Sequence, residues 1–237
     1  MPNWASTERI KLMKNFGAHV TLISKEEGGF IECVKRAKKF AKENNGFLAN
    51  QFENEFNILA HYETTGEEII KTIPEKLEAF VSGVGTGGTL MGISKKLKES
   101  FPNLLTVAVE PKKMPMIYDK LNNISSNLIQ HKIEGIGDDF IPELVETKEI
   151  NKIILIDDND AINMSRKFAQ ELGLGIGISS GANFLGSVLL KNDIKGAVAT
   201  LFADDNKKYL STDLSKEIDL NDILLSNKIK LLTYEVV

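Results

Sequence analysis

The stretch Ala79-Phe80-Val81-Ser82-Gly83-Val84-Gly85-Thr86-Gly87-Gly88-Thr89 decides the fold of this chain. It opens with a short apolar run, typical of a buried parallel strand, and continues into residues 83–88, where four of six residues are glycine. A helical pattern follows, with apolar residues on one face and lysines on the other. Pro102 ends that helix, and the apolar residues 104–109 predict the next strand. The sequence therefore predicts a right-handed strand–helix–strand unit.

The glycine-rich junction between this strand and this helix favours a phosphate. The start of a helix presents unpaired N–H groups and the positive end of the helix dipole, and residues without a Cβ let an oxyanion approach the backbone. Threonine hydroxyls add further donors. The residues that we predict to bind the phosphate are Gly85, Thr86, Gly87, Gly88 and Thr89. A tight turn without a ligand is the alternative that the junction alone leaves open.

The spacing of this junction argues against two common nucleotide motifs. It lacks the Gly-Lys-Ser/Thr ending of a nucleoside triphosphate loop. No acidic residue closes a strand about 20 residues further on, as the ribose of a dinucleotide requires. Glu110 is the nearest candidate and lies too far along the chain. A single phosphate on a small cofactor fits the spacing better.

The composition is that of a globular protein and gives no sign of a membrane span or of a general affinity for nucleic acid. Of the 237 residues, 42% are apolar and 26% charged, and the net charge of -4 gives no general attraction for nucleic acid. No window approaches the roughly 18 apolar residues of a membrane span, and the lone Cys33 suits a reducing compartment. The three histidines are too scattered for a metal cluster. We expect a cytoplasmic protein without a metal site.

The rest of the chain alternates between predicted helices and strands. We predict helices at 8–16, 30–43 and 66–73 and strands at 20–23 and 46–52 before the central unit, and strands at 152–156 and 197–202 after it. This pattern predicts an α/β fold of open, mostly parallel twisted sheets with helices on both faces. The chain begins on a helix, and two strands make a poor parallel sheet, so the first section is expected to be incomplete. Residues 53–65 are polar and dotted with aromatic side chains, and we take them as a connection. We therefore predict the remainder of a smaller N-terminal α/β domain over 1–52 and a larger cofactor-binding α/β domain over 53–237.

Three motifs in this order and spacing resemble a known enzyme family. They are Gly85-Thr86-Gly87-Gly88-Thr89, the segment Glu134-Gly135-Ile136-Gly137 followed by Phe140-Ile141-Pro142, and Gly177-Ile178-Ser179-Ser180-Gly181-Ala182. Together they resemble the pyridoxal-phosphate enzymes of the cysteine synthase and cystathionine β-synthase family (fold type II). The likeness runs from Met1-Pro2 almost to the end, through Tyr209-Leu210-Ser211-Thr212.

The resemblance implies a cofactor, a substrate class and roles for single residues. It implies that pyridoxal 5'-phosphate binds through the threonine–glycine loop, and that Ser179 faces the pyridine nitrogen. A hydroxyl partner leaves that nitrogen largely unprotonated, which suits β-elimination and β-replacement. The alternative for Ser179 is a helix cap. The resemblance also implies that Gln51 and Gly135 bind a small amino-acid substrate and that the protein is a homodimer.

Two functional features of the family have no counterpart in this chain. The family's Schiff-base lysine, and its Thr-Ser-Gly-Asn loop for the substrate carboxylate, match positions before Met1. The lysines at 35–42 and 95–98 are predicted on solvated helix faces, so none is nominated as a substitute. The sequence is therefore expected to be an N-terminally truncated enzyme or a degenerate relative that is inactive alone.

Asp138 and Asp139 indicate the chemistry within the family. Cysteine synthases usually have small residues here, whereas the cystathionine β-synthase branch has an aspartate at the position of Asp139. A carboxylate beside the reacting Cβ can activate water, which would turn cysteine into serine plus hydrogen sulfide. The alternatives are a condensation of serine with a thiol, solvated loop aspartates without a role, and a catalytically dead module that binds the cofactor phosphate.

Overall fold

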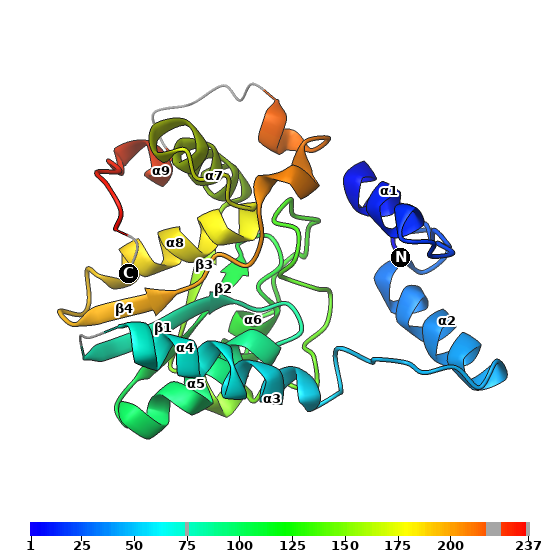
Figure 1. Cartoon of the computed structure of the whole chain (residues 1–237), viewed down its shortest axis with the longest axis horizontal. Coiled ribbons are helices and arrows are strands. Elements are labelled where there is room, and N and C mark those ends of the chain that lie inside the picture. The colour runs from blue at the N-terminus through cyan, green and yellow to red at the C-terminus, as the bar shows by residue number, and fades with distance from the viewer. Residues whose placement is uncertain (74–75, 217–223, 236–237) are drawn as a thin grey trace.

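The computed structural model describes residues 1–73, 76–216 and 224–235 and is built around one parallel sheet (Figure 1). The four strands are β1 (Leu77–Gly83), β2 (Leu105–Pro111), β3 (Lys152–Ile156) and β4 (Ala197–Thr200). They lie in the order β3-β2-β1-β4, and every neighbouring pair is parallel. The strand before the glycine-rich junction is thus central, and Ala79 pairs with Leu105 of β2. The α/β class predicted from the sequence is confirmed.

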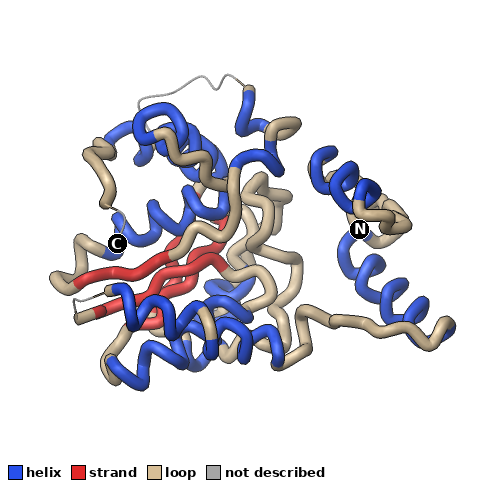
Figure 2. The backbone as a smooth tube through the Cα atoms, viewed as in Figure 1, coloured by secondary structure: helices blue, strands red, loops and turns tan. Residues whose placement is uncertain are grey.

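Helices cover both faces of the sheet, as Figures 1 and 2 show. Alternate residues of β1 point to opposite faces. Val81 packs in the cluster of α7 (Asp158–Leu172) and α8 (Ile178–Leu190), and Phe80 packs in the cluster of α5 (Gly88–Ser100). Both faces of β1 thus pack against apolar helix side chains, which explains why the strands are continuous apolar runs rather than alternating ones.

The remaining elements of the large domain are short. Among the described residues they are α3 (Phe56–Glu63), α4 (Thr65–Thr72), α6 (Met116–Asn122), η1 (Thr147–Glu149), η2 (Asn206–Tyr209), η3 (Asp213–Ser215) and α9 (Leu225–Lys228). No helix within the described ranges is long and apolar enough to cross a membrane.

The first section contains two helices, α1 (Thr7–Asn15) and α2 (Gly29–Glu43), which stand apart from the sheet (Figure 1). The strands predicted at 20–23 and 46–52 are wrong, because the described structure holds only an isolated bridge between Pro2 and Ile23 there. A strand needs a hydrogen-bonded neighbour, and no sheet lies beside this section in the described residues. The large side chains of Phe40 and Phe47 are exposed. The helices thus lack a sheet to pack against, as expected for an incomplete domain.

A cluster of three aromatic rings joins the first section to the large domain. Phe30 of α2 and Phe52 lie with ring centroids 5.5 Å apart, and Phe52 is 5.1 Å from Phe140. Edge-to-face rings at such distances are favourable pairs. The cluster places the first section against the loop that follows Gly135.

Residues 53–65, predicted as a connection, instead contain the helix α3 and the start of α4. Close packing explains the helix better than its own amphipathic pattern does. At Gly92 of α5 an added Cβ would lie 2.4 Å from the carbonyl oxygen of Ile58 and 2.9 Å from Cβ of His61. Because α5 carries glycine at this contact, the backbones of α3 and α5 approach closely. The sequence feature that favours α3 is therefore Gly92 of α5, which lies outside α3 itself. The domain boundary at 52/53 remains a prediction.

Gly92→Ala tests this close approach. Alanine in a helix interior gains about 1 kcal/mol over glycine by propensity, but overpacking costs about 1–3 kcal/mol. We expect a net loss in the free energy of unfolding, measured by urea titration. Gly46→Ala, outside the helices, is the uncrowded control, because its added Cβ would meet only Ala41 atoms at 3.6 Å or more. If Gly92→Ala stabilises the protein as much as the control does, the packing account is wrong.

Candidate functional site

The three motifs predicted from the sequence meet at the carboxyl end of β1. A Cβ added to Gly85 would lie 2.4 Å from the carbonyl oxygen of Gly135, and one added to Gly135 would lie 3.9 Å from Oγ of Ser179. Asn183 of α8 fixes this arrangement, because its Oδ1 accepts from the N–H of Gly83 at 2.7 Å and its Nδ2 donates to the carbonyl of Leu201. Segments about 50 and 95 residues apart thus form one site, where ligands of open α/β sheets bind.

The loop from Gly85 to Thr89 has the donors that a phosphate needs. Gly87 has φ of +90° and precedes the first turn of α5. Within the described residues, the backbone N–H groups of Gly85, Thr86 and Gly87 donate to no protein acceptor. Unpartnered N–H groups at the start of a helix are a ready anion site. The loop therefore fits a phosphate.

Ser179 has the environment expected for a group that contacts a ligand. It lies in the first turn of α8 and is 5% exposed. Its hydroxyl forms no hydrogen bond within the described part of the chain, and buried hydroxyls normally have a partner. A helix cap would use this hydroxyl on a backbone N–H, but no such bond is present at the start of α8. A ring nitrogen of a ligand would satisfy it.

The two loop aspartates differ in their surroundings. Asp138 is half-buried, whereas Asp139 is exposed. Burial raises the pKa of the Asp138 carboxyl to about 6, with a further contribution from the negative charge of Asp139. Asp138 therefore has the pKa of a group that exchanges protons near neutral pH, whereas the family resemblance had pointed to Asp139.

Gln51 and Gly135 lie at the edges of the site. Gln51 is exposed, and its carbonyl accepts a hydrogen bond from Nδ2 of Asn57 at 2.8 Å. Gly135 has φ of +98°, a conformation that favours glycine. Gly135 lies between Gly85 and Ser179 and is exposed.

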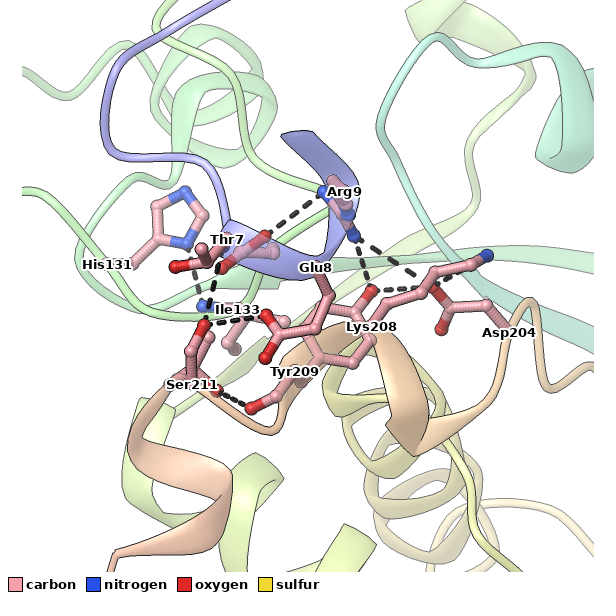
Figure 3. Close-up of polar contacts among 11 residues, drawn as sticks. Thr7, Glu8, Arg9, His131, Ile133, Asp204, Lys208, Tyr209 and Ser211 are labelled. Atoms are coloured by element: carbon pink, nitrogen blue, oxygen red, sulfur yellow. Dashed lines mark hydrogen bonds and ion pairs between the residues drawn. The ribbon is translucent and has the colours of Figure 1, made fainter. Parts of the chain in front are cut away.

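A polar network that was not predicted from the sequence joins α1 to this site (Figure 3). Nη1 of Arg9 lies 3.1 Å from Oε2 of Glu134, and Nη2 donates to Oη of Tyr209 at 2.7 Å. Tyr209 in turn donates to Oδ2 of Asp204 at 2.6 Å. Burial raises the pKa of Glu134, and the charge of Arg9 opposes that shift. Because Glu134 precedes Gly135, the network holds the first section against a site loop.

Ser211 adds a second link in the same view. Its hydroxyl donates to Oε2 of Glu8 at 2.6 Å and accepts from the N–H of Thr7 (Figure 3). The only sequence signal was that Glu8, Arg9 and Tyr209 lie in segments that match the family. No spacing rule pairs residues about 200 positions apart.

The groups present fit pyridoxal 5'-phosphate. Free N–H groups at the start of α5 suit its phosphate, and the unpartnered hydroxyl of Ser179 suits its pyridine nitrogen. No group of three or more potential metal ligands occurs in the described residues. Of the described lysines, none forms a hydrogen bond or ion pair with the 85–89 loop or with Ser179.

Comparison with known proteins gives the same cofactor. Residues 1–204 match the model of the family described as pyridoxal-phosphate dependent enzyme. The cysteine synthase of Staphylococcus aureus (strain Mu50) is 37% identical over 217 residues, which cover 90% of this chain and 68% of the relative. Cysteine synthase B of Campylobacter jejuni is also 37% identical, over 90% of this chain and 70% of its own length.

Solved structures agree with these relatives. A hydrogen sulfide-producing enzyme from Fusobacterium nucleatum has a TM-score of 0.88 and 44% identity over 96% of this chain and 68% of its own. An aspartate-to-asparagine variant of a hydrogen sulfide-producing enzyme, solved with an α-aminoacrylate intermediate, has a TM-score of 0.89 and 43% identity, with the same coverage. The O-acetylserine-dependent cystathionine β-synthase from Helicobacter pylori has a TM-score of 0.80 and 34% identity over 93% of this chain and 69% of its own. The chain therefore belongs to the family of pyridoxal-phosphate-dependent enzymes that includes the cysteine synthases, which carry out β-replacement and β-elimination on small amino acids.

Proposed function

We propose that the distinctive reaction of this protein converts cysteine into serine and hydrogen sulfide. The observation that carries the proposal is the carboxylate pair Asp138 and Asp139, which follows Gly135 in the loop beside Ser179. The similar hydrogen sulfide-producing enzyme supports it, because that protein was solved as an aspartate-to-asparagine variant with an α-aminoacrylate intermediate. A carboxylate at this place in the site suits activation of water.

The residues have distinct roles in this proposal. The cofactor-binding residues are Gly85, Thr86, Gly87, Gly88, Thr89 and Ser179. Gln51 and Gly135 bind the amino-acid substrate. Pyridoxal 5'-phosphate, when bound, supplies the electron sink that weakens the bonds at Cα and Cβ of the amino acid. The chain's own part is to hold that group and to move protons.

The chemistry at Cβ is a hydrolytic exchange. A proton leaves Cα, and the C–S bond breaks as sulfur departs with its electron pair as hydrosulfide. Water then bonds to Cβ while a carboxylate takes one of its protons, and a proton returns to Cα. The carboxylate passes its proton to hydrosulfide, so that cysteine and water give serine and hydrogen sulfide. No oxidant or reductant is needed. A base of this kind contributes about 10²–10⁴-fold to the rate.

Burial decides which aspartate we assign as the base. A general base works best when its pKa lies near the working pH. Half-buried Asp138, with its pKa raised to about 6, meets this condition. Asp139, the residue predicted from the sequence, is exposed and is kept as the alternative.

Asp138→Asn and Asp139→Asn separate the two assignments. The assay measures sulfide released from cysteine by the natural gene product with cofactor bound, including any residues that precede position 1 in it. We expect Asp138→Asn to lower the rate by about 100-fold or more, the share of a general base. Asp139→Asn should keep most of the rate.

The pH dependence of the rate tests the same assignment of the base. The base acts when ionised, so the wild-type rate should rise as the pH rises through about 6. Asp139→Asn removes a neighbouring negative charge and should move that rise to lower pH. An unchanged rate in Asp138→Asn contradicts the assignment, and a loss confined to Asp139→Asn transfers it to that residue.

Ser179→Ala tests the cofactor site independently of turnover. The lost hydrogen bond is worth about 0.5–1.5 kcal/mol, so we expect pyridoxal 5'-phosphate to bind several-fold more weakly, up to about tenfold. Equilibrium dialysis measures this. Ser180→Ala is the matched control, because the buried hydroxyl of Ser180 lies next in the chain and has no hydrogen-bond partner. Equal affinities in both variants would remove Ser179 from the site.

A second candidate function is the condensation of serine with a thiol. The likeness to the cystathionine β-synthase from Helicobacter pylori favours it. Serine plus a thiol, assayed by mass spectrometry, gives a thioether product in that case and little sulfide from cysteine. Cofactor binding without either product would indicate a dead module. The homodimer, the cytoplasmic location and the lack of a Schiff-base lysine remain predictions.

A further inference from the structure

Two side chains of α3 reach the threonines of the predicted phosphate loop. Nδ2 of Asn57 lies 2.9 Å from Oγ1 of Thr86, and Nε2 of His61 lies 3.1 Å from Oγ1 of Thr89. Asn57 and His61 are four residues apart, so they lie on one face of the helix. The same face packs on α5, where a Cβ added to Gly88 would lie 2.0 Å from Oδ1 of Asn57.

The hydrogen bonds of Thr86 leave its hydroxyl hydrogen free. Asn57 donates to Oγ1 of Thr86 and, with its other amide hydrogen, to the carbonyl of Gln51 at 2.8 Å. Both contacts are with oxygen acceptors, which fixes the orientation of the amide. The N–H of Gly88 also donates to Oγ1 of Thr86, at 3.3 Å. A hydroxyl oxygen has two lone pairs, and two donors fill them. Thr86 can therefore act only as a donor to a further partner.

His61 contacts Thr89 from the same helix face, and the tautomer of its ring decides which of the two groups donates. Its Nδ1 lies 3.1 Å from Oγ1 of Thr65, and its Nε2 lies 3.1 Å from Oγ1 of Thr89. Burial lowers the pKa of His61, which favours the neutral ring with one donor and one acceptor. If Thr65 donates to Nδ1, the proton is on Nε2 and is donated to Thr89. The hydroxyl hydrogen of Thr89 is then free for an anion.

We propose that Asn57 and His61 are positioning residues that turn the hydroxyl hydrogens of Thr86 and Thr89 toward the cofactor phosphate. The inference rests on the proposed phosphate site at this loop. It adds that the loop binds a phosphate tightly only when α3 supplies two donors behind it. A hydroxyl without such a donor can rotate and present a lone pair, which repels the anion.

The matched variants His61→Asn and His61→Gln test the orientation. The side-chain amide of asparagine reaches the place of Nδ1 of histidine, where its Oδ1 accepts from Thr65, and the amide nitrogen of glutamine reaches the place of Nε2. His61→Asn therefore keeps only the contact with Thr65, and His61→Gln keeps only the donor to Thr89. Asn57→Ala removes the donor to Thr86 and serves as a second, independent variant on the same helix.

The readout is the ratio of the dissociation constants of pyridoxal and pyridoxal 5'-phosphate, measured on the full chain by equilibrium dialysis. Dividing the two dissociation constants separates the contribution of the phosphate to binding from that of the pyridine ring. We expect His61→Asn and Asn57→Ala each to lower the ratio about tenfold, because each loses an aligned donor to a charged group. His61→Gln should keep it within about threefold. In a Thr89→Val background, His61→Asn should have no further effect, because the hydroxyl it aligns is gone.

The outcomes separate this inference from the proposed function. A wild-type ratio near one means that the loop binds no phosphate. That result would rule out both the positioning role and the proposed phosphate site. A high wild-type ratio that persists in His61→Asn and Asn57→Ala overturns the positioning role alone. An equal loss in His61→Asn and His61→Gln also overturns it, because the side chain would then act by packing. Urea unfolding of each variant shows whether it is folded at the assay temperature, and Asn57→Ala decides the question if the histidine variants are not.

Discussion

The close approach of two backbones at Gly85 is the constraint on which the rest of the site depends. The carbonyl oxygen of Gly135 occupies the place that a Cβ on Gly85 would take. This approach requires glycine at the end of β1 and brings the 134–142 loop over the start of α5. Ser179 then lies beside Gly135, so one steric condition assembles three segments that are far apart in sequence. The cofactor site follows from that condition and from the parallel sheet beneath it.

The large domain could be predicted from local patterns. Buried parallel strands are short apolar runs, and the glycines and Pro102 mark where α5 begins and ends, so β1 to β4 and α5 were predicted near their observed bounds. The helix α3 could not be predicted, because its stability comes from contact with the glycines of α5 rather than from its own pattern. In the first section, alternating apolar residues predicted strands at 20–23 and 46–52, but a strand exists only where a neighbour completes its hydrogen bonds. Local patterns carry no information about that neighbour.

In the candidate site, too, local features could be predicted from the sequence and tertiary contacts could not. Residue types and spacing predicted the phosphate loop, and the family resemblance predicted Ser179; both assignments remain predictions. The resemblance favoured Asp139, and only the structure shows that Asp138 is the more buried of the two. Residue types and spacing also missed the supporting groups, Arg9 behind Glu134 and His61 behind Thr89, which act across 125 and 28 positions of the chain. Supporting contacts of this kind depend on tertiary structure alone.

The most direct test of the central claim is a crystal structure of this chain grown with pyridoxal 5'-phosphate. The account predicts phosphate oxygens within hydrogen-bond distance of the N–H groups of Gly85, Thr86 and Gly87, with the pyridine nitrogen facing Oγ of Ser179. It also predicts that the carbonyl of Gly135 stays against Gly85 in the bound state. A cofactor bound elsewhere, or bound here with its phosphate turned away from the start of α5, would contradict the account.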